Sequence, residues 1–322
     1  MPSVNINFHG ASVLFETDSE EYLGIILSEY RDHISEGGGR ASHRMAVMTE
    51  EPVQERIPDE AIRLSAVFPS ASVYAHRGKT YLSEVRKFFI EISPASSEIE
   101  VRVSPAARIS EKVRYLSKRL LVKAIEDSGL TWIHGSSACD GSGALVFTGV
   151  SGSGKTTALL TMLEKGYSML TDDVIVFKEG KILPFCMRSM IHSKTAERFP
   201  HLRSALKTAA ASEWDPQADG AWLNLGRVFQ SASSPVAPRA LFNTHVWNSE
   251  RSECRLSDAA KTVPKLIRNY MLESGSVFEP SQAQLKRTFT SYSSLADAIP
   301  CYDLFVGRDS QALHEALRGA LR

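Results

Sequence analysis

The sequence GVSGSGKTT, at residues 149–157, follows the apolar run ALVF at 144–147. It matches the pattern Gly-x-x-x-x-Gly-Lys-[Ser/Thr], a phosphate-binding loop that joins a strand to a helix. The apolar run predicts the strand. The residues from Lys155 to about Lys165 predict the helix, which Gly166 ends. Because the motif has a strand before it and a helix after it, we expect this loop to hold phosphate.

Each residue type in the loop has a physical role toward phosphate. Glycines adopt positive φ and leave room for phosphate oxygens, while successive backbone N–H groups and the start of a helix attract anions. Lys155 is expected to contact the β- and γ-phosphates, and the Thr156 hydroxyl is expected to bind Mg²⁺. The residues predicted to bind the nucleotide are Gly149, Ser151, Gly152, Ser153, Gly154, Lys155, Thr156 and Thr157.

Two adjacent acids follow the predicted helix, in the sequence MLTDDVIVF at 169–177. Asp172 and Asp173 interrupt an apolar stretch that reads as one strand and its continuation, where carboxylates need a cation or a proton. Next to a phosphate site, one carboxylate can hold Mg²⁺ and the other can accept a proton from an attacking hydroxyl. Neighbouring side chains on a strand point in different directions, so the two acids can divide these tasks. A turn or helix cap made by an Asp pair is the alternative.

Composition limits the remaining possibilities. The chain has 322 residues, 43% of them hydrophobic, which suits about two domains with cores of their own. Lysine plus arginine number 37 and aspartate plus glutamate also 37, so no basic field indicates a nucleic-acid partner. The four cysteines form no CxxC pair, and no apolar stretch is long enough for a signal peptide or a membrane span. We therefore expect a cytoplasmic protein without a membrane partner.

The periodicity of the chain changes near residue 105 and predicts two domains, 1–105 and 106–322. The first is β-rich and is expected to be an accessory or substrate-recognition domain, with a hairpin turn at AHRGKT and a glycine-rich loop at 34–40. The second reads as α/β and opens with a helix from Ser110 that Gly129 ends. Its other predicted elements are strands at 131–135, 168–177, 181–185 and 240–247, a loop at 231–239 and a helix at 310–321.

His134 lies 21 residues before Lys155, in the sequence WIHGSS. A lone histidine in such a place is more often structural than functional. The order His134-Gly135, an apolar strand, the phosphate loop, EKGYSMLTDD and a further strand resembles the catalytic core of the HPr kinase/phosphorylase family. The resemblance covers residues 108 to 195, and it includes the spacing between the motifs.

The resemblance implies a fold, ligands and roles. The fold is a phosphate-loop core like that of HPr kinase and phosphoenolpyruvate carboxykinase, with a mixed sheet flanked by helices. The implied ligands are ATP and Mg²⁺. The likeness also suggests assembly into a homo-oligomer, while the sequence itself leaves the oligomeric state open. In these implied roles, Lys155 and the loop bind the ATP phosphates, and Thr156 and Asp172 bind the metal ion. Asp173 accepts the proton of a substrate hydroxyl, and His134 stands beside it and assists the phosphate or Asp173.

The sequence also departs from that family. The Glu-x-Arg-Gly segment after the acid pair and the basic segment linked to phosphorylase activity are missing, and Glu197 does not stand in for the family's metal-binding glutamate. The chain is more similar to a divergent kinase-like branch associated with bacterial biosynthetic clusters, which includes peptide serine kinases. In that branch the segment ILPFCMRSMIHSK makes Arg188 and Lys194 candidates for contacts with substrate or phosphate, and otherwise they are solvated charges.

The first hypothesis is an ATP-dependent kinase that phosphorylates a hydroxyl, namely that of a serine in a peptide or protein. A kinase for free serine or another small hydroxyl compound is the second hypothesis. A nucleotide-binding regulator that transfers no phosphate is the third, and the acid pair argues against it because a sensor needs no base beside the γ-phosphate.

Overall fold

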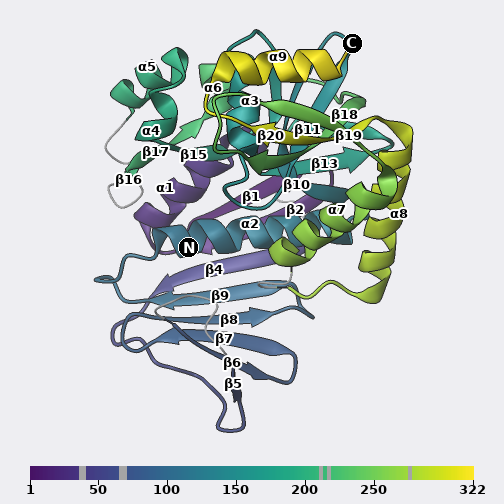
Figure 1. The fold of residues 1–322 in the computed structure, drawn as a ribbon. Helices are drawn as coiled ribbons and strands as arrows, with labels where there is room; N and C mark the ends of the chain where they lie inside the picture. Colours follow the sequence, from purple (N-terminus) through teal and green to yellow (C-terminus); the bar gives the residue numbers. More distant parts are fainter. Residues whose placement is uncertain (36–40, 65–70, 210–212, 216–218, 275–277) are drawn as a thin grey trace. The chain divides into compact units, whose positions relative to one another are not determined.

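The computed structural model describes residues 1–322 except 36–40, 65–70, 210–212, 216–218 and 275–277 (Figure 1). It is an α/β protein with mixed sheets. The described residues form two compact units, Met1–Gly129 with Ser274–Pro280, and Leu130–Glu273 with Ser281–Arg322. Each unit has its own main sheet, as two domains require.

The first unit contains a nine-stranded sheet in the order β3-β1-β2-β4-β9-β8-β7-β6-β5. Strand β4 is parallel to both β2 and β9, and the other neighbours are antiparallel. Most of the predicted loop at 34–40 lies outside the described residues. The strands are β1 Ser3–Phe8, β2 Ala11–Thr17, β3 Ile34–Ser35, β4 His43–Thr49, β5 Ile62–Leu64, β6 Ser72–His76, β7 Lys79–Glu84, β8 Phe88–Ser93 and β9 Glu98–Val103.

Local sequence explains much of this sheet. In β9 the apolar residues Ile99, Val101 and Val103 alternate with polar ones and are fully buried, as a strand with one covered face requires. Between β6 and β7, Arg77 and Gly78 have φ values of 46° and 75°. Two successive residues with positive φ form the tight turn that matches strand twist. The hairpin predicted at AHRGKT is therefore present.

The helices of the first unit are α1 Glu20–Glu29, the 3₁₀ turn η1 Arg31–His33 and α2 Ser110–Asp127. The sequence predicted α2 but assigned it to the second domain, after a boundary near residue 105. In the structure Val113, Leu116 and Leu120 of α2 are fully buried, and the helix packs on β2 and β4. The division between the units therefore follows α2, at Gly129, because the apolar face of this helix covers the first sheet.

The second unit contains an eight-stranded sheet in the order β14-β13-β10-β11-β18-β20-β19, with β12 also paired to β10. A separate three-stranded sheet has the order β15-β17-β16. The strands are β10 Thr131–Asp140, β11 Gly143–Thr148, β12 Ser168–Thr171, β13 Val174–Lys178, β14 Lys181–Leu183, β15 Arg188–His192, β16 Trp214–Asp215, β17 Gly220–Asn224, β18 Pro238–Val246, β19 Glu253–Ser257 and β20 Cys301–Val306.

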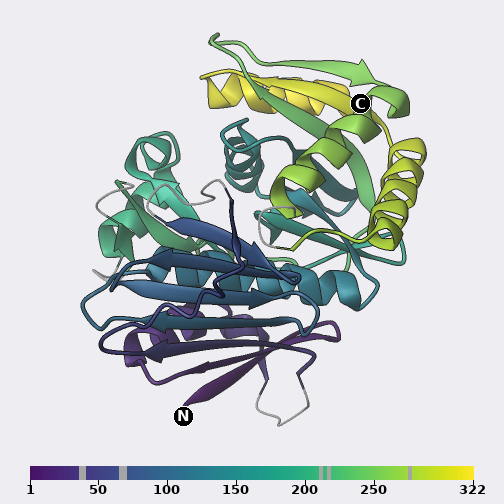
Figure 2. The same cartoon turned by 90° about the horizontal axis from the view of Figure 1, so that it is seen from below.

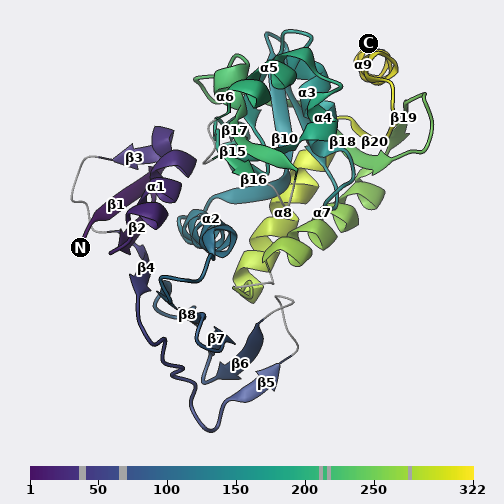
Figure 3. The same cartoon turned by 90° about the vertical axis from the view of Figure 1, so that its left-hand side faces the viewer.

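Three strands of the main sheet, β11, β18 and β20, run parallel to one another. Helices cover both faces, with α3 and α9 on one side and α7 and α8 on the other (Figure 3). Tyr270 of α7 and Tyr292 of α8 meet edge to face at 6.4 Å between ring centroids, and Figure 2 shows these helices side by side. The helices are α3 Lys155–Leu163, α4 Ser193–Ala196, α5 Pro200–Thr208, α6 Leu225–Val228, α7 Ala259–Ser274, α8 Gln282–Ala298 and α9 Ser310–Ala320.

One predicted strand differs from the structure. The stretch 168–177 is divided into β12 and β13 at Asp172 and Asp173, and both pieces pair with β10. Asp173 has a φ of 81°, which no strand residue adopts. The acid pair therefore sits on a break between strands and not within one strand.

None of the helices in the described part of the chain is long and apolar enough to cross a membrane.

Candidate functional site

The loop 149–157 leaves the carboxyl end of β11 and enters α3 at Lys155. Three glycines have positive φ, 150° at Gly149, 76° at Gly152 and 99° at Gly154. The Ser153 hydroxyl is buried and lies 2.7 Å from Thr244 Oγ1 of β18, while Ser151 is exposed. The predicted nucleotide-binding residues thus form one continuous loop that is fastened to the neighbouring parallel strand.

Lys155 is 8% exposed, and its ammonium group lies within the loop. Its Nζ donates hydrogen bonds to the carbonyl oxygens of Gly149, at 2.9 Å, and Val150, at 3.0 Å. The α3 backbone begins at the same residue, so the charge and the first N–H groups of the helix lie together. This combination attracts a polyanion.

Asp172 connects the acid pair to the loop. Its Oδ1 accepts hydrogen bonds from Ser136 Oγ of β10, at 2.5 Å, and from Thr156 Oγ1 of α3, at 3.4 Å. Burial raises the pKa of this carboxyl above its ordinary value, and the Ser136 hydroxyl opposes the shift. Asp173 raises the pKa further, and Lys155 lowers it. Thr156 and Asp172, the two residues predicted to bind the metal ion, are therefore in contact.

Asp173 and His134 form a second pair beside the first. His134 Nδ1 lies 3.0 Å from Asp173 Oδ1 and 3.0 Å from the Asp173 carbonyl oxygen, and its Nε2 lies 3.8 Å from Glu273 Oε1. The Asp173 side chain is 34% exposed, whereas that of His134 is 11% exposed. With its proton on Nδ1, the imidazole donates to Asp173 and fixes the carboxylate while leaving one side of it accessible.

The loop opens into a pocket of about 570 Å³. It lies at the carboxyl ends of the three parallel strands, the edge where α/β proteins bind ligands. The sequence did not predict its far wall, which lies after β18 and β20. The lining residues are Gly152, Gly154, Lys155, Thr156, Thr157, Arg198, Val246, Trp247, Asn248, Val306, Gly307 and Arg308.

A polar network that the sequence did not predict lies across β18 and β20. Asp303 Oδ1 accepts hydrogen bonds from Lys265 Nζ, at 2.6 Å, and from Asn243 Nδ2 and His245 Nε2, both at 3.0 Å. Although burial alone would raise it, these hydrogen bonds lower the pKa of Asp303 to about 2. Polar residues within the apolar strands ALFNTHVW and CYDLFV are the signal that could have identified this network.

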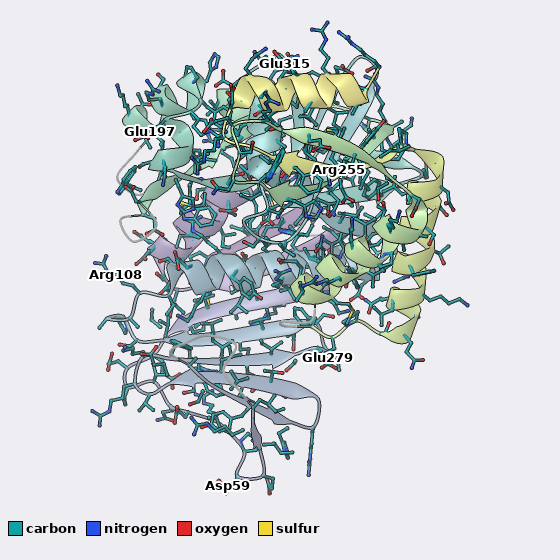
Figure 4. The ribbon with its side chains drawn as sticks, viewed as in Figure 1. Asp59, Arg108, Glu197, Arg255, Glu279 and Glu315 are labelled. Carbon is teal, nitrogen blue, oxygen red and sulfur yellow. The ribbon has the colours of Figure 1, made fainter. Side chains whose placement is uncertain are left out.

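The two residues suggested for substrate contacts lie elsewhere in the second unit. Arg188 of β15 is buried and donates to Glu213 Oε1, at 2.6 Å, and to the Trp222 carbonyl. Its charge is therefore already compensated, and it is not the solvated charge that the sequence allowed. Lys194 is exposed on α4, and Glu197, which Figure 4 labels, is exposed directly after this helix. Neither Arg188 nor Lys194 lines the pocket described above.

A scan against protein-family models finds no match to the chain, and a search of curated proteins finds none either.

The loop geometry makes a prediction about Gly149. A Cβ at this position would lie 2.5 Å from Ser153 Oγ and 2.9 Å from Thr244 Oγ1. We expect Gly149→Ala to lower the free energy of unfolding by about 3 kcal/mol, through overpacking and an unfavourable φ. Gly152→Ala is the matched control, since a Cβ there meets no atom within 4 Å, and it should cost only about 1 kcal/mol. Urea unfolding measures both, and equal losses would contradict the prediction.

The Asp303 network predicts a pH dependence. Because the folded-state pKa is lowered, the stabilising contribution of this carboxylate is complete above its ordinary value of 3.8 and is lost as the pH falls toward about 2. Asp303→Asn should lower the free energy of unfolding by about 1 kcal/mol at neutral pH. The difference from wild type should shrink at pH values below 3.8. Asp297→Asn, an exposed change on α8, is the control, and a difference that stays constant with pH would refute the assignment.

Proposed function

We propose that the protein is an ATP-dependent kinase that transfers the γ-phosphoryl group to a hydroxyl. The acceptor that we propose first is a serine of a peptide or protein. The observation that carries the proposal is the contact of Asp172 with Thr156, which brings the acid pair to the first turn of the phosphate loop's helix. A loop that only bound phosphate would need no buried acid at this place. The same proposal includes a fold for the second unit like that of HPr kinase.

The donor set fits ATP and Mg²⁺. The loop offers backbone N–H groups, the Lys155 ammonium and the start of α3 to the phosphates. The oxygens of Thr156 and Asp172 lie 3.4 Å apart, and Mg²⁺ prefers such oxygen ligands, completed by phosphate and water. Among the residues that the structure describes, no group of three His, Cys, Asp or Glu could hold a metal ion. When bound, Mg²⁺ would neutralise charge on the phosphate oxygens.

The two acids then have separate roles. Asp172 is buried between Ser136 and Thr156, which suits a carboxylate that faces a cation. Asp173 is more exposed and is held by His134, which suits a base that must meet an incoming hydroxyl. In the transfer step Asp173 accepts the hydroxyl proton as the oxygen attacks the γ-phosphorus, and the bond from that phosphorus to the bridging oxygen of the β-phosphate breaks, which releases ADP. Lys155 and the loop N–H groups hold the phosphate oxygens in position, which supplies most of the rate enhancement.

We expect Asp173→Asn to abolish transfer while keeping nucleotide binding. Removing a general base lowers kcat by about 10²–10⁴-fold, whereas the Kd for Mg·ATP should change by less than about twofold, since the residue does not hold the phosphates in this scheme. Lys155→Ala should raise that Kd by about tenfold or more, because charge-assisted hydrogen bonds are lost. Calorimetry gives the Kd values, and radiolabelled ATP with a serine-peptide library or free serine gives the transfer rates.

Matched controls are available on α8, where Asp297→Asn and Lys286→Ala change exposed charges of the same types. Label that appears on peptide, and not on free serine, supports the peptide kinase; the reverse supports the small-molecule kinase. If ATP binds but no acceptor receives label, the protein is a nucleotide-binding regulator. Equal transfer by wild type and Asp173→Asn would remove Asp173 as the base.

A further inference from the structure

The far wall of the pocket is built from residues that phosphate does not require. Val246 ends β18 and is followed by Trp247 and Asn248, and Val306 ends β20 and is followed by Gly307. A triphosphate bound at the loop occupies only the near end, where Lys155, Thr156 and Thr157 lie, so the nucleoside needs a place of its own. The volume of about 570 Å³ is within the range of small-molecule sites.

The wall exposes apolar surface. Val246, the last residue of β18, is 66% exposed, and Trp247, which follows it, is 37% exposed, although the middle of this strand is buried. The Trp247 ring meets Phe305 in an edge-to-face contact, with 6.1 Å between ring centroids and an interplanar angle of 68°. This contact covers at most one face of the indole, so the exposed part of the ring can meet another flat ring. Stacking of a nucleic-acid base on an aromatic side chain is worth about 1–3 kcal/mol.

Backbone hydrogen bonds hold the wall rigidly. Trp247 N donates to Val306 O at 2.9 Å, and Arg308 N donates to Ser249 O at 2.8 Å. Gly307 permits this approach, because a Cβ there would lie 2.2 Å from the Arg251 carbonyl oxygen. The Trp247 backbone is therefore fixed to the end of β20.

The same strand end also touches the phosphate loop. A Cβ on Gly154 would lie 3.1 Å from Val306 Cβ, so the loop and β20 are in direct contact. Val306 thus joins the loop to the segment that carries Trp247, and the distance between the phosphate site and the indole is set by the sheet. Fixed spacing of this kind suits a ligand with a phosphate end and an aromatic end.

The charge of the lining suits the same ligand. Lys155, Arg198 and Arg308 line the pocket, and no carboxylate is present among the described lining residues. Arg198 donates to the Arg308 carbonyl, and Arg308 donates to Asn248 Oδ1. These bonds tie the basic residues to the wall around Trp247.

From this geometry we infer that Trp247 is the base-binding residue of the nucleotide site, and that the base of a nucleoside triphosphate stacks on its indole while the phosphates lie in the loop 149–157. The inference rests on the proposed function, because it requires a nucleotide at the loop. Since every base has a stacking face, Trp247 binds purine nucleotides without selecting among them.

Comparing two ligands tests the inference. Mg·ATP has phosphates and a base, and magnesium tripolyphosphate has phosphates alone. Trp247→Ala should raise the Kd for ATP by about tenfold, as the loss of one stacking contact predicts, and should leave the Kd for tripolyphosphate unchanged. Trp247→Phe should lose less ATP affinity than Trp247→Ala. Trp214→Ala is the matched control, because Trp214 is 39% exposed in the same unit, and it should change neither Kd.

The outcomes separate the two proposals. If wild type binds neither ligand, the phosphate-loop assignment fails and the inference fails with it. If wild type binds both and Trp247→Ala binds ATP normally, the base site is elsewhere, although the loop assignment stands. If Trp247→Ala loses tripolyphosphate as well, Trp247 supports the loop and does not stack on a base. Quenching of tryptophan fluorescence by ATP, and not by tripolyphosphate, should also disappear in Trp247→Phe.

Discussion

A buried carboxylate, Asp172, holds together the three segments from which the site is built. Ser136 belongs to β10, Thr156 to the first turn of α3, and Asp172 itself to the break between β12 and β13. Burial of a carboxylate costs several kcal/mol unless hydrogen bonds or charges compensate it. The hydroxyls of Ser136 and Thr156 and the nearby Lys155 offset part of that cost, although burial still raises the pKa of the carboxyl. The carboxylate can remain buried only if strand, helix and break keep these positions, so it constrains all three.

The sheet supplies the second constraint. Strands β11, β18 and β20 are parallel, so their carboxyl ends lie at one edge of the sheet. The phosphate loop, the segment with Trp247 and the segment with Gly307 each follow one of these strands. Trp247 follows the loop by about ninety residues, and Gly307 follows Trp247 by sixty. The three segments nevertheless line one pocket. Thr244 fastens the loop to β18, and Val306 contacts it from β20.

Local patterns in the sequence were sufficient for the centre of this site. The strand, loop and helix around Lys155 form as predicted, since each is specified by consecutive residues. The contact between His134 and Asp173 followed from the order of motifs and not from spacing alone. The wall at Trp247 was not predicted, because the pairing of β18 with β20 joins strands separated by two helices. Periodicity identifies an apolar face but does not say which element covers it, and for the same reason the sequence placed α2 in the second domain.

The acid pair shows how one residue type takes two environments in adjacent positions. The sequence allowed for different directions through strand alternation, but the structure achieves the difference by another route. Asp173 has a φ of 81°, so the chain turns sharply between the two side chains. Asp172 points into the buried region beside Thr156, and Asp173 lies beside His134, where 34% of its side chain is exposed. A general base must reach solvent or substrate, and a carboxylate that faces a cation is better shielded from water. The left-handed backbone at Asp173 is therefore the local feature that lets two neighbouring aspartates serve different partners.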